Sequence, residues 1–302
     1  MHQNKNKQHQ PVLLQEVLTY LDPQAGEAYL DLTAGYGGHA AEVLNRTQAP
    51  PKTTLVDRDA EAIAHLKEVF AGESVELIHQ DYQQAAAELA SQGRRYDCIM
   101  ADIGVSSPHL DKASRGFSVQ TDEPLDMRMD QRQSLTAEVV LNSYGEEELR
   151  RILRTYGEEP KAVRIAREIV AQRPLTTTQQ LAKICERAWG GRSKRHPATR
   201  TFQAIRIAVN DELGQLEAVL PTLVELLAPG GRMAIISFHS LEDRIVKEFL
   251  KAHGGNRYDA QLRLLTKKPV TAAEGELVFN PRARSAKLRA AAKINTKKPE
   301  GL

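Results

Sequence analysis

The chain has 302 residues, a net charge of +2 and 41% hydrophobic residues, which is enough for about two domains with full cores. Residues 1–10 do not resemble a signal peptide and no apolar run approaches the roughly 18 residues that span a bilayer, so we expect a cytoplasmic protein with no membrane partner. Cys98 and Cys185 have no partner at metal-ligand spacing. We therefore expect reduced thiols and no bound metal.

Strand-like and helix-like patterns alternate through the first hundred residues. The apolar runs typical of strands cover 28–32, 53–56, 75–79 and 97–103, and the helical patterns between them cover 38–45, 60–70 and 83–91. The alternation resumes with a strand over 232–237 and a helix over 241–253, where Ser240 is the expected N-cap and Asp243 its partner three residues on. These patterns predict an α/β fold with a parallel, Rossmann-like sheet.

A glycine-rich turn joins the first predicted strand to the first helix. Gly35 and Gly37 allow positive φ there and bring bare backbone against a ligand, and Gly38 extends this cradle. Asp57 ends the next strand, about 20 residues on, where a cofactor's ribose hydroxyls are expected to meet a carboxylate. The segment therefore predicts a site for a nucleotide-like cofactor.

Two cofactors fit this turn. The spacing Gly35-x-Gly37-x-x-Ala40 satisfies the dinucleotide fingerprint, so an NAD-dependent oxidoreductase is one alternative. Asp31, however, places a negative charge at the mouth of the turn, where it repels a pyrophosphate and attracts the sulfonium and ammonium groups of S-adenosylmethionine. We therefore favour S-adenosylmethionine.

A helical domain is predicted to interrupt the sheet-forming sequence. Apolar residues recur at three- and four-residue spacing over 136–144, 146–156, 161–172, 178–189 and 199–213. We expect a first core part over 1–111, an all-helical substrate-recognition domain over 112–208, and a second core part over 209–302 whose basic tail orders only on binding. Residues 113–208 hold 17 Lys and Arg against 12 Asp and Glu. Arg192, Lys194 and Arg195 lie in their most basic stretch, which suits a polyanion such as RNA.

A second group of candidate residues follows the fourth and fifth large predicted strands. Asp102 ends the fourth strand, at the edge where open α/β sheets bind ligands. An exocyclic amine that receives a methyl group needs hydrogen-bond acceptors, which Asp102 and the loop containing Ser106, Ser107 and Pro108 can supply. Phe238 and His239, at the same edge, are candidates to stack on or bond to a flipped base.

The motifs resemble one family along nearly the whole chain. They include Asp31-x-Thr-x-Gly-x-Gly-Gly-His39, Asp57-Arg-Asp59, the loop 102–111, Arg115-Gly-Phe117, 196–203, 237–244 and 280–285. This pattern resembles the bacterial small-subunit ribosomal RNA cytosine-N4 methyltransferases, the RsmH or MraW family. The resemblance implies a class I S-adenosylmethionine-dependent fold and methylation of N4 of the P-site cytosine of 16S rRNA, within an assembled small subunit. A ribosome-assembly or RNA-binding factor with a vestigial cofactor site is the non-catalytic alternative.

The resemblance also implies which residues contact the cofactor. These positions fall on Gly37, Gly38, His39, Asp57, Tyr82, Asp102 and His109. His109 departs from the family, whose members commonly have Gln there, and an imidazole replaces only one of the two amide hydrogen bonds. Asp81 is a second departure, and it is placed to accept from the adenine amino group while Tyr82 packs on the ring. Whether Asp102 polarises the amine or mainly holds the cofactor stays open at this stage.

Overall fold

The computed structural model describes residues 11–104, 115–191, 196–255 and 258–294. The chain divides into two compact units, one formed by 1–104 with 215–302 and the other by 105–214. The sequence placed the corresponding divisions after 111 and after 208. No helix among the described residues is long and apolar enough to cross a membrane.

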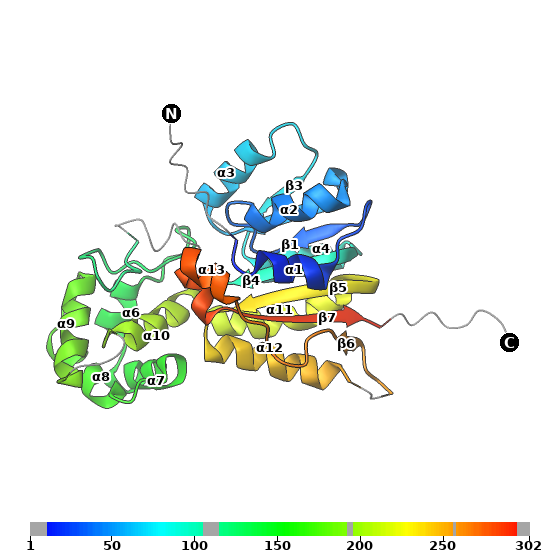
Figure 1. Ribbon diagram of the computed structural model, residues 1–302. Helices are drawn as coiled ribbons and strands as arrows, with labels where there is room; N and C mark the ends of the chain where they lie inside the picture. The colour runs from blue at the N-terminus through cyan, green and yellow to red at the C-terminus, as the bar shows by residue number, and fades with distance from the viewer. Residues whose placement is uncertain (1–10, 105–114, 192–195, 256–257, 295–302) are drawn as a thin grey trace. The chain divides into compact units, whose positions relative to one another are not determined.

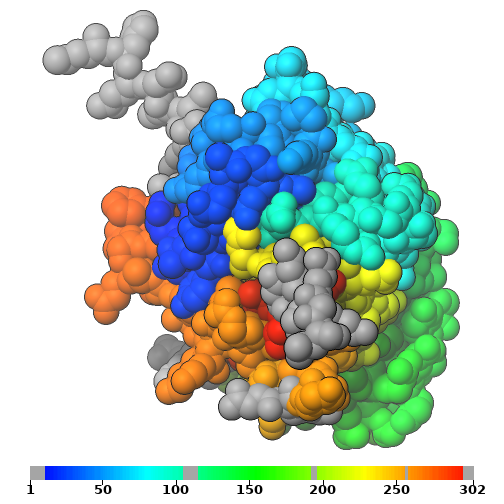
Figure 2. All heavy atoms as spheres, turned by 90° about the vertical axis from the view of Figure 1, so that its right-hand side faces the viewer, coloured from blue at the N-terminus to red at the C-terminus, as the bar shows by residue number. Residues whose placement is uncertain are grey.

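The first unit is built on one seven-stranded sheet (Figure 1). Its strands are β1 (Tyr29–Asp31), β2 (Thr53–Asp57), β3 (Glu76–His79), β4 (Tyr96–Ile103), β5 (Leu227–Ser237), β6 (Leu262–Leu264) and β7 (Lys287–Lys293). They lie in the order β3-β2-β1-β4-β5-β7-β6. The first five are parallel, and β7 runs antiparallel between β5 and β6. The space-filling view of Figure 2 shows the early, blue-to-cyan part of the chain and the late, yellow-to-red part forming one continuous body.

Side chains at alternate strand positions point to opposite faces of the sheet and pack in two hydrophobic layers, one on each face. Leu30, Ile99 and Ile235 pack with α4 (Tyr82–Ser91), the later part of α11 (Glu212–Leu226) and α12 (Ser240–His253). Tyr29, Met100 and Ile236 pack on the other face with α1 (Leu14–Leu21), α2 (Gly38–Thr47) and α3 (Ala60–Val69). Because both faces are covered, the inner parallel strands β1, β2 and β4 are mainly buried, whereas the edge strand β3 is only partly buried.

The strand order separates this sheet from the dinucleotide-binding fold, whose order is 3-2-1-4-5-6. Here the antiparallel β7 lies next to β5, and Ser237 of β5 pairs with Lys287 of β7. The order still reverses between β1 and β4, which are neighbours. Ligands of open α/β sheets bind beyond the carboxyl ends of the two strands between which the order reverses. Here β1 ends at Asp31 and β4 ends at Ile103.

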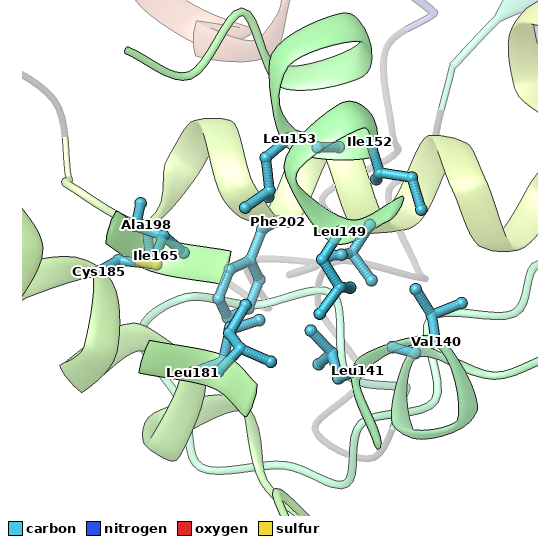
Figure 3. Close-up of a cluster of buried hydrophobic side chains, with 14 of the residues drawn as sticks. Val140, Leu141, Leu149, Ile152, Leu153, Ile165, Leu181, Cys185, Ala198 and Phe202 are labelled. Atoms are coloured by element: carbon cyan, nitrogen blue, oxygen red, sulfur yellow. The ribbon is translucent and has the colours of Figure 1, made fainter. Parts of the chain in front are cut away.

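The second unit is helical in its described part. Its helices are α6 (Ala137–Ser143), α7 (Glu146–Gly157), α8 (Ala162–Ala171), α9 (Thr178–Trp189) and α10 (Thr199–Asn210). They enclose a core of their own, which includes Leu149, Leu153, Leu181 and Phe202 (Figure 3). The inserted all-helical part of the predicted fold class is thus confirmed, as is the α/β core.

Three expectations about local structure are wrong. The helix expected over 199–213 ends at Asn210, because Asp211 has φ +48° and α11 begins immediately after it. The N-cap of α12 is His239, not Ser240, and the partner at its third position is Glu242, not Asp243. Asp243 instead accepts hydrogen bonds from Arg289 (2.7 Å) and Lys287 (3.2 Å).

The third wrong expectation concerns the basic C-terminal segment. Its residues up to 293 need no partner to order, because they form η2 (Pro281–Ser285) and β7 within the sheet. The sequence patterns also missed α1, α11, β6 and α13 (Glu274–Phe279). α11 contains Pro221 within its apolar pattern, a residue that is unfavourable inside a helix.

Candidate active site

Thr33 links the carboxyl ends of β1 and β4. Its backbone amide donates to Oδ1 of Asp31 (3.1 Å), and its hydroxyl oxygen accepts from the backbone amide of Asp102 (2.6 Å). Tyr29 donates its hydroxyl to Oδ2 of Asp31 (2.8 Å), so both oxygens of this buried carboxylate are bonded. Asp31 and Asp102 are therefore held on two neighbouring strands by one shared residue.

Asp102 has a different environment from Asp31. Its Oδ1 atom is inaccessible to solvent and accepts no hydrogen bond from the residues that the structure describes. Burial, followed by the negative charges of Asp31 and Glu242, raises the pKa of Asp102 to about 8. Burial also raises the pKa of Asp31 to about 6, against the hydrogen bonds from Tyr29 and Thr33. Ionising both carboxyl groups therefore costs free energy unless a cation is nearby.

The glycine turn is shaped by Asp57, which ends β2. Gly35 and Gly37 have φ of +53° and +81°, as the sequence predicts, and the Gly37 amide closes the turn on the Ala34 carbonyl (2.8 Å). Asp57 accepts from the Gly35 amide through Oδ2 and from the Asp59 amide through Oδ1, both at 2.8 Å. Burial raises the pKa of Asp57, and these amide bonds oppose that rise.

The remaining cofactor candidates of this unit already have structural contacts. His39 is 8% exposed, and its Nε2 lies 2.9 Å from the Val12 carbonyl. Tyr82 is 7% exposed and packs in the hydrophobic layer on its side of the sheet. Asp81 is the N-cap of α4, since its Oδ1 accepts from the Gln84 amide (2.9 Å). Gly38 is the first residue of α2, and a Cβ there would lie 2.6 Å from Pro11.

The turn after β5 is held by Glu242, a fully buried side chain. Its Oε2 accepts from the backbone amides of Phe238 (2.8 Å) and His239 (3.2 Å), while the His239 imidazole accepts from the Glu242 amide in return. The Phe238 ring lies against the backbone of Gly104, where an added Cβ would come within 2.6 Å of it. Phe238 is thus packed across the ends of β4 and β5, as expected for residues of one sheet edge.

The loop and basic-patch candidates cannot be placed. Ser106, Ser107, Pro108, His109, Arg192, Lys194 and Arg195 all lie outside the described residues. Two described residues of the site were not anticipated. Thr33 is the middle polar residue of Asp-x-Thr-x-Gly. Glu242 was missed because the N-cap was expected at Ser240, one residue later than His239.

The residues present fit a cationic cofactor without phosphate. The edge offers the acidic side chains of Asp31, Asp57 and Asp102 and a glycine backbone, and the negative charge of a pyrophosphate there would make ionisation of these groups still less favourable. A sulfonium or ammonium group instead favours ionisation of the same carboxylates.

Comparison with known proteins decides between the remaining alternatives. Residues 6–294 match the model of the MraW methylase family. The chain belongs to this family. It is therefore a methyltransferase that uses S-adenosylmethionine, and both the oxidoreductase and the non-catalytic alternatives are wrong.

Members of the MraW family from several bacteria are similar to this chain over almost its full length. The protein named "Ribosomal RNA small subunit methyltransferase H" of Nitratidesulfovibrio vulgaris (strain DP4) is 48% identical over 95% of both chains. The protein of the same name from Cyanothece sp. (strain PCC 7425) is 49% identical, again over 95% of both. Among solved structures, an rRNA methylase from Streptococcus thermophilus has 10% identity and a TM-score of 0.42, over 94% of this chain and 98% of that one.

Proposed function

We propose that this chain transfers a methyl group from S-adenosylmethionine to N4 of the P-site cytosine of 16S rRNA, within the small ribosomal subunit and in the cytoplasm. The observation that carries the proposal is the sheet edge where Thr33 joins Asp31 to Asp102, in a chain whose relatives at 46–49% identity are named small-subunit rRNA methyltransferases. An acidic edge of this kind suits a cationic methyl donor and an exocyclic amine together.

The cofactor is proposed to lie along the carboxyl ends of β1, β2 and β4. Asp57 would bond the ribose hydroxyls, Gly35, Gly37 and Gly38 would supply bare backbone, and Asp31 would attract the positive charge. His39, Asp81, Tyr82, Asp102 and His109 complete the proposed set. The bound cofactor supplies an electrophilic methyl group on a sulfonium.

Asp102 is proposed as the catalytic residue. The lone pair of a cytosine amine is delocalised into the ring, so the amine needs an acceptor that favours a more tetrahedral nitrogen. The Asp102 carboxyl has an Oδ1 atom that no described residue bonds, which suits this role. Ser106, Ser107 and Pro108 would help orient the base, and Phe238 and His239 would contact it.

The inserted region is proposed to bind the RNA. Residues 112–208 would form this domain, and Arg192, Lys194 and Arg195 would contact phosphates. The described part of the insert is a helical unit with its own core, which can hold such side chains on a stable surface. No metal is required by this scheme.

The test is the methylation state of 16S rRNA in a strain that lacks the gene. Mass spectrometry and primer extension should find N4-methylcytosine lost at the P site and restored by the wild-type gene but not by a gene carrying Asp57→Ala. An unchanged modification in the deletion strain would sink the proposed substrate. Purified protein with S-adenosylmethionine should methylate small subunits from that strain and not those from the parent strain, whose site is already modified.

A further inference from the structure

Three acidic side chains lie at the carboxyl edge of the sheet and have no Lys or Arg partner among the described residues of this unit. Asp31 ends β1, Asp102 lies near the end of β4, and Glu242 lies in the first turn of α12. Within the described part of this unit, none of the three forms an ion pair with Lys or Arg, and Glu242 pairs only with His239 (3.1 Å). They therefore form an acidic cluster without a strong cation of its own.

The three members of the cluster differ in how well they are bonded. Asp31 accepts from the Tyr29 hydroxyl and the Thr33 amide, one on each oxygen, and Glu242 accepts from two backbone amides through Oε2, while its Oε1 has no hydrogen-bond partner among the described residues. Hydrogen bonds of this kind stabilise the ionised form. No residue in the described part of the chain donates to the inaccessible Oδ1 of Asp102. Among neighbouring carboxyl groups, the one with the fewest hydrogen-bond donors most readily keeps a proton.

The surrounding charges act in the same direction. Asp31 from β1 and Glu242 from α12 act on Asp102, and Asp57 from β2 acts on Asp31. With its pKa raised to about 8, Asp102 is mainly protonated at pH 7 in the free protein. A cation brought to this edge makes ionisation favourable again.

We propose that Asp102 holds a proton in the free enzyme, releases it when the cationic cofactor binds, and takes up the proton that the substrate amine loses during methyl transfer. This inference rests on the proposed cofactor site and on an amine substrate. It does not depend on which RNA carries the amine.

The proton balance of the transfer is complete under this proposal. The bond between the methyl carbon and sulfur breaks and leaves its electron pair on sulfur, while the amine nitrogen forms the new carbon bond and gives up one proton. Asp102, ionised while the sulfonium is present, accepts that proton as the positive charge on sulfur disappears. The product complex then resembles the free enzyme in charge, with Asp102 protonated.

The experiment is calorimetric titration of the free protein with S-adenosylmethionine or S-adenosylhomocysteine at pH 7, each in phosphate and in Tris. The dependence of the binding heat on the buffer's ionisation heat gives the protons released. We expect about 0.5 to 1 proton per site for S-adenosylmethionine and a smaller number for the neutral thioether. At pH 9 the release should fall towards zero, because Asp102 has already lost its proton.

Two variants assign the proton to Asp102. Asp102→Asn keeps the size of the side chain but cannot titrate, so its proton release should be near zero with either ligand. Glu68→Gln, at an exposed carboxyl on α3, is the matched control and should release as many protons as the wild-type protein.

The outcomes separate this inference from the proposed function. Tight binding of S-adenosylmethionine without proton release overturns the inference and leaves the methyltransferase assignment intact. Equal release with both ligands also overturns it, since the cluster would then respond to the ammonium group that both ligands carry. The wild-type comparison of the two ligands remains decisive even if Asp102→Asn does not fold. Failure to bind either ligand would instead contradict the proposed cofactor site.

Discussion

The backbone amide of Gly35 donates a 2.8 Å hydrogen bond to Oδ2 of Asp57 and so ties the glycine turn to the end of the neighbouring strand. The Asp59 amide occupies Oδ1 at the same distance. Asp57 therefore organises the protein backbone with both oxygens and still has lone pairs for a ligand, because each carboxylate oxygen can accept two bonds.

Asp57→Ala should weaken binding of S-adenosylmethionine by roughly tenfold to 150-fold, since a charge-assisted hydrogen bond contributes about 1.5 to 3 kcal/mol. Asp57→Asn should weaken it too, because an NH2 group would replace one of the two oxygens and would face a backbone N–H, of Gly35 or of Asp59, from which it cannot accept. Calorimetry measures the affinity, and circular dichroism checks that the fold survives. Wild-type affinity in both variants would show that Asp57 does not contact the cofactor.

Gly37→Ala should lower both stability and cofactor affinity. At φ +81° a side chain costs about 1 to 2 kcal/mol, and the new Cβ would lie 3.1 Å from Leu66 and from Phe70. Gly72→Ala is the matched control, since Gly72 has φ +88° but no atom within 4 Å of an added Cβ. Urea unfolding should show a loss in both variants, whereas only Gly37→Ala should lose affinity. Equal affinity in the two variants would contradict a ligand at this turn.

Much of this sheet edge can be predicted from the sequence, because the patterns that indicate it lie within short stretches of the chain. Strands that end in Asp31, Asp57 and Asp102 and a turn with two glycines are visible within short windows. The link through Thr33 is not, because its hydroxyl meets an amide 69 residues away. Sequence reasoning therefore found the carboxylates but not the residue that holds two of them together.

The errors have equally specific causes. Ser240 and Asp243 match the usual N-cap preferences, but the buried Glu242 reaches back to two amides and fixes the cap one residue earlier. The Ala-rich stretch of β7 has weak strand propensity, and it forms a strand only because β5 and β6 pair with it on both sides. Both features depend on tertiary contacts that no local pattern carries.

The stability of the free protein should fall as the pH rises from 6 to 8. The pKa values of Asp31 and Asp102, raised to about 6 and about 8, lie above the 3.8 of an unperturbed Asp, so the folded state holds protons that the unfolded chain has lost. A rise in pH in this window therefore favours the unfolded state. Urea unfolding at pH 6, 7 and 8 tests this slope, and Asp102→Asn should flatten it between pH 7 and 8. A slope unaffected by that substitution would show that other groups set it.

Replacing Arg192, Lys194 and Arg195 together with Ala should weaken binding to small subunits and reduce its salt dependence. Each lost phosphate contact lowers the slope of log affinity against log salt by roughly 0.7 to 0.9. Replacing Arg150, Arg151 and Arg154 of α7 removes the same charge and is the control, because Arg150 and Arg151 already pair with Glu147 and Glu148. Filter binding across a salt series should separate the two variants. If the first variant and the wild type have the same slope of log affinity against log salt, other residues contact the RNA phosphates.

Asp102→Asn should separate catalysis from cofactor binding. The change keeps the side-chain size and one acceptor oxygen but removes the charge that can stabilise positive character on the amine as the methyl group arrives. If this is the main role of Asp102, the single-turnover rate at saturating cofactor should fall by roughly 10²-fold or more while affinity changes less. If Asp102 mainly holds the cofactor, affinity should fall at least as much as the rate. The Oδ1 atom favours the first result, because it is an acceptor to which no described residue donates. A variant with wild-type rate and wild-type affinity would exclude both roles.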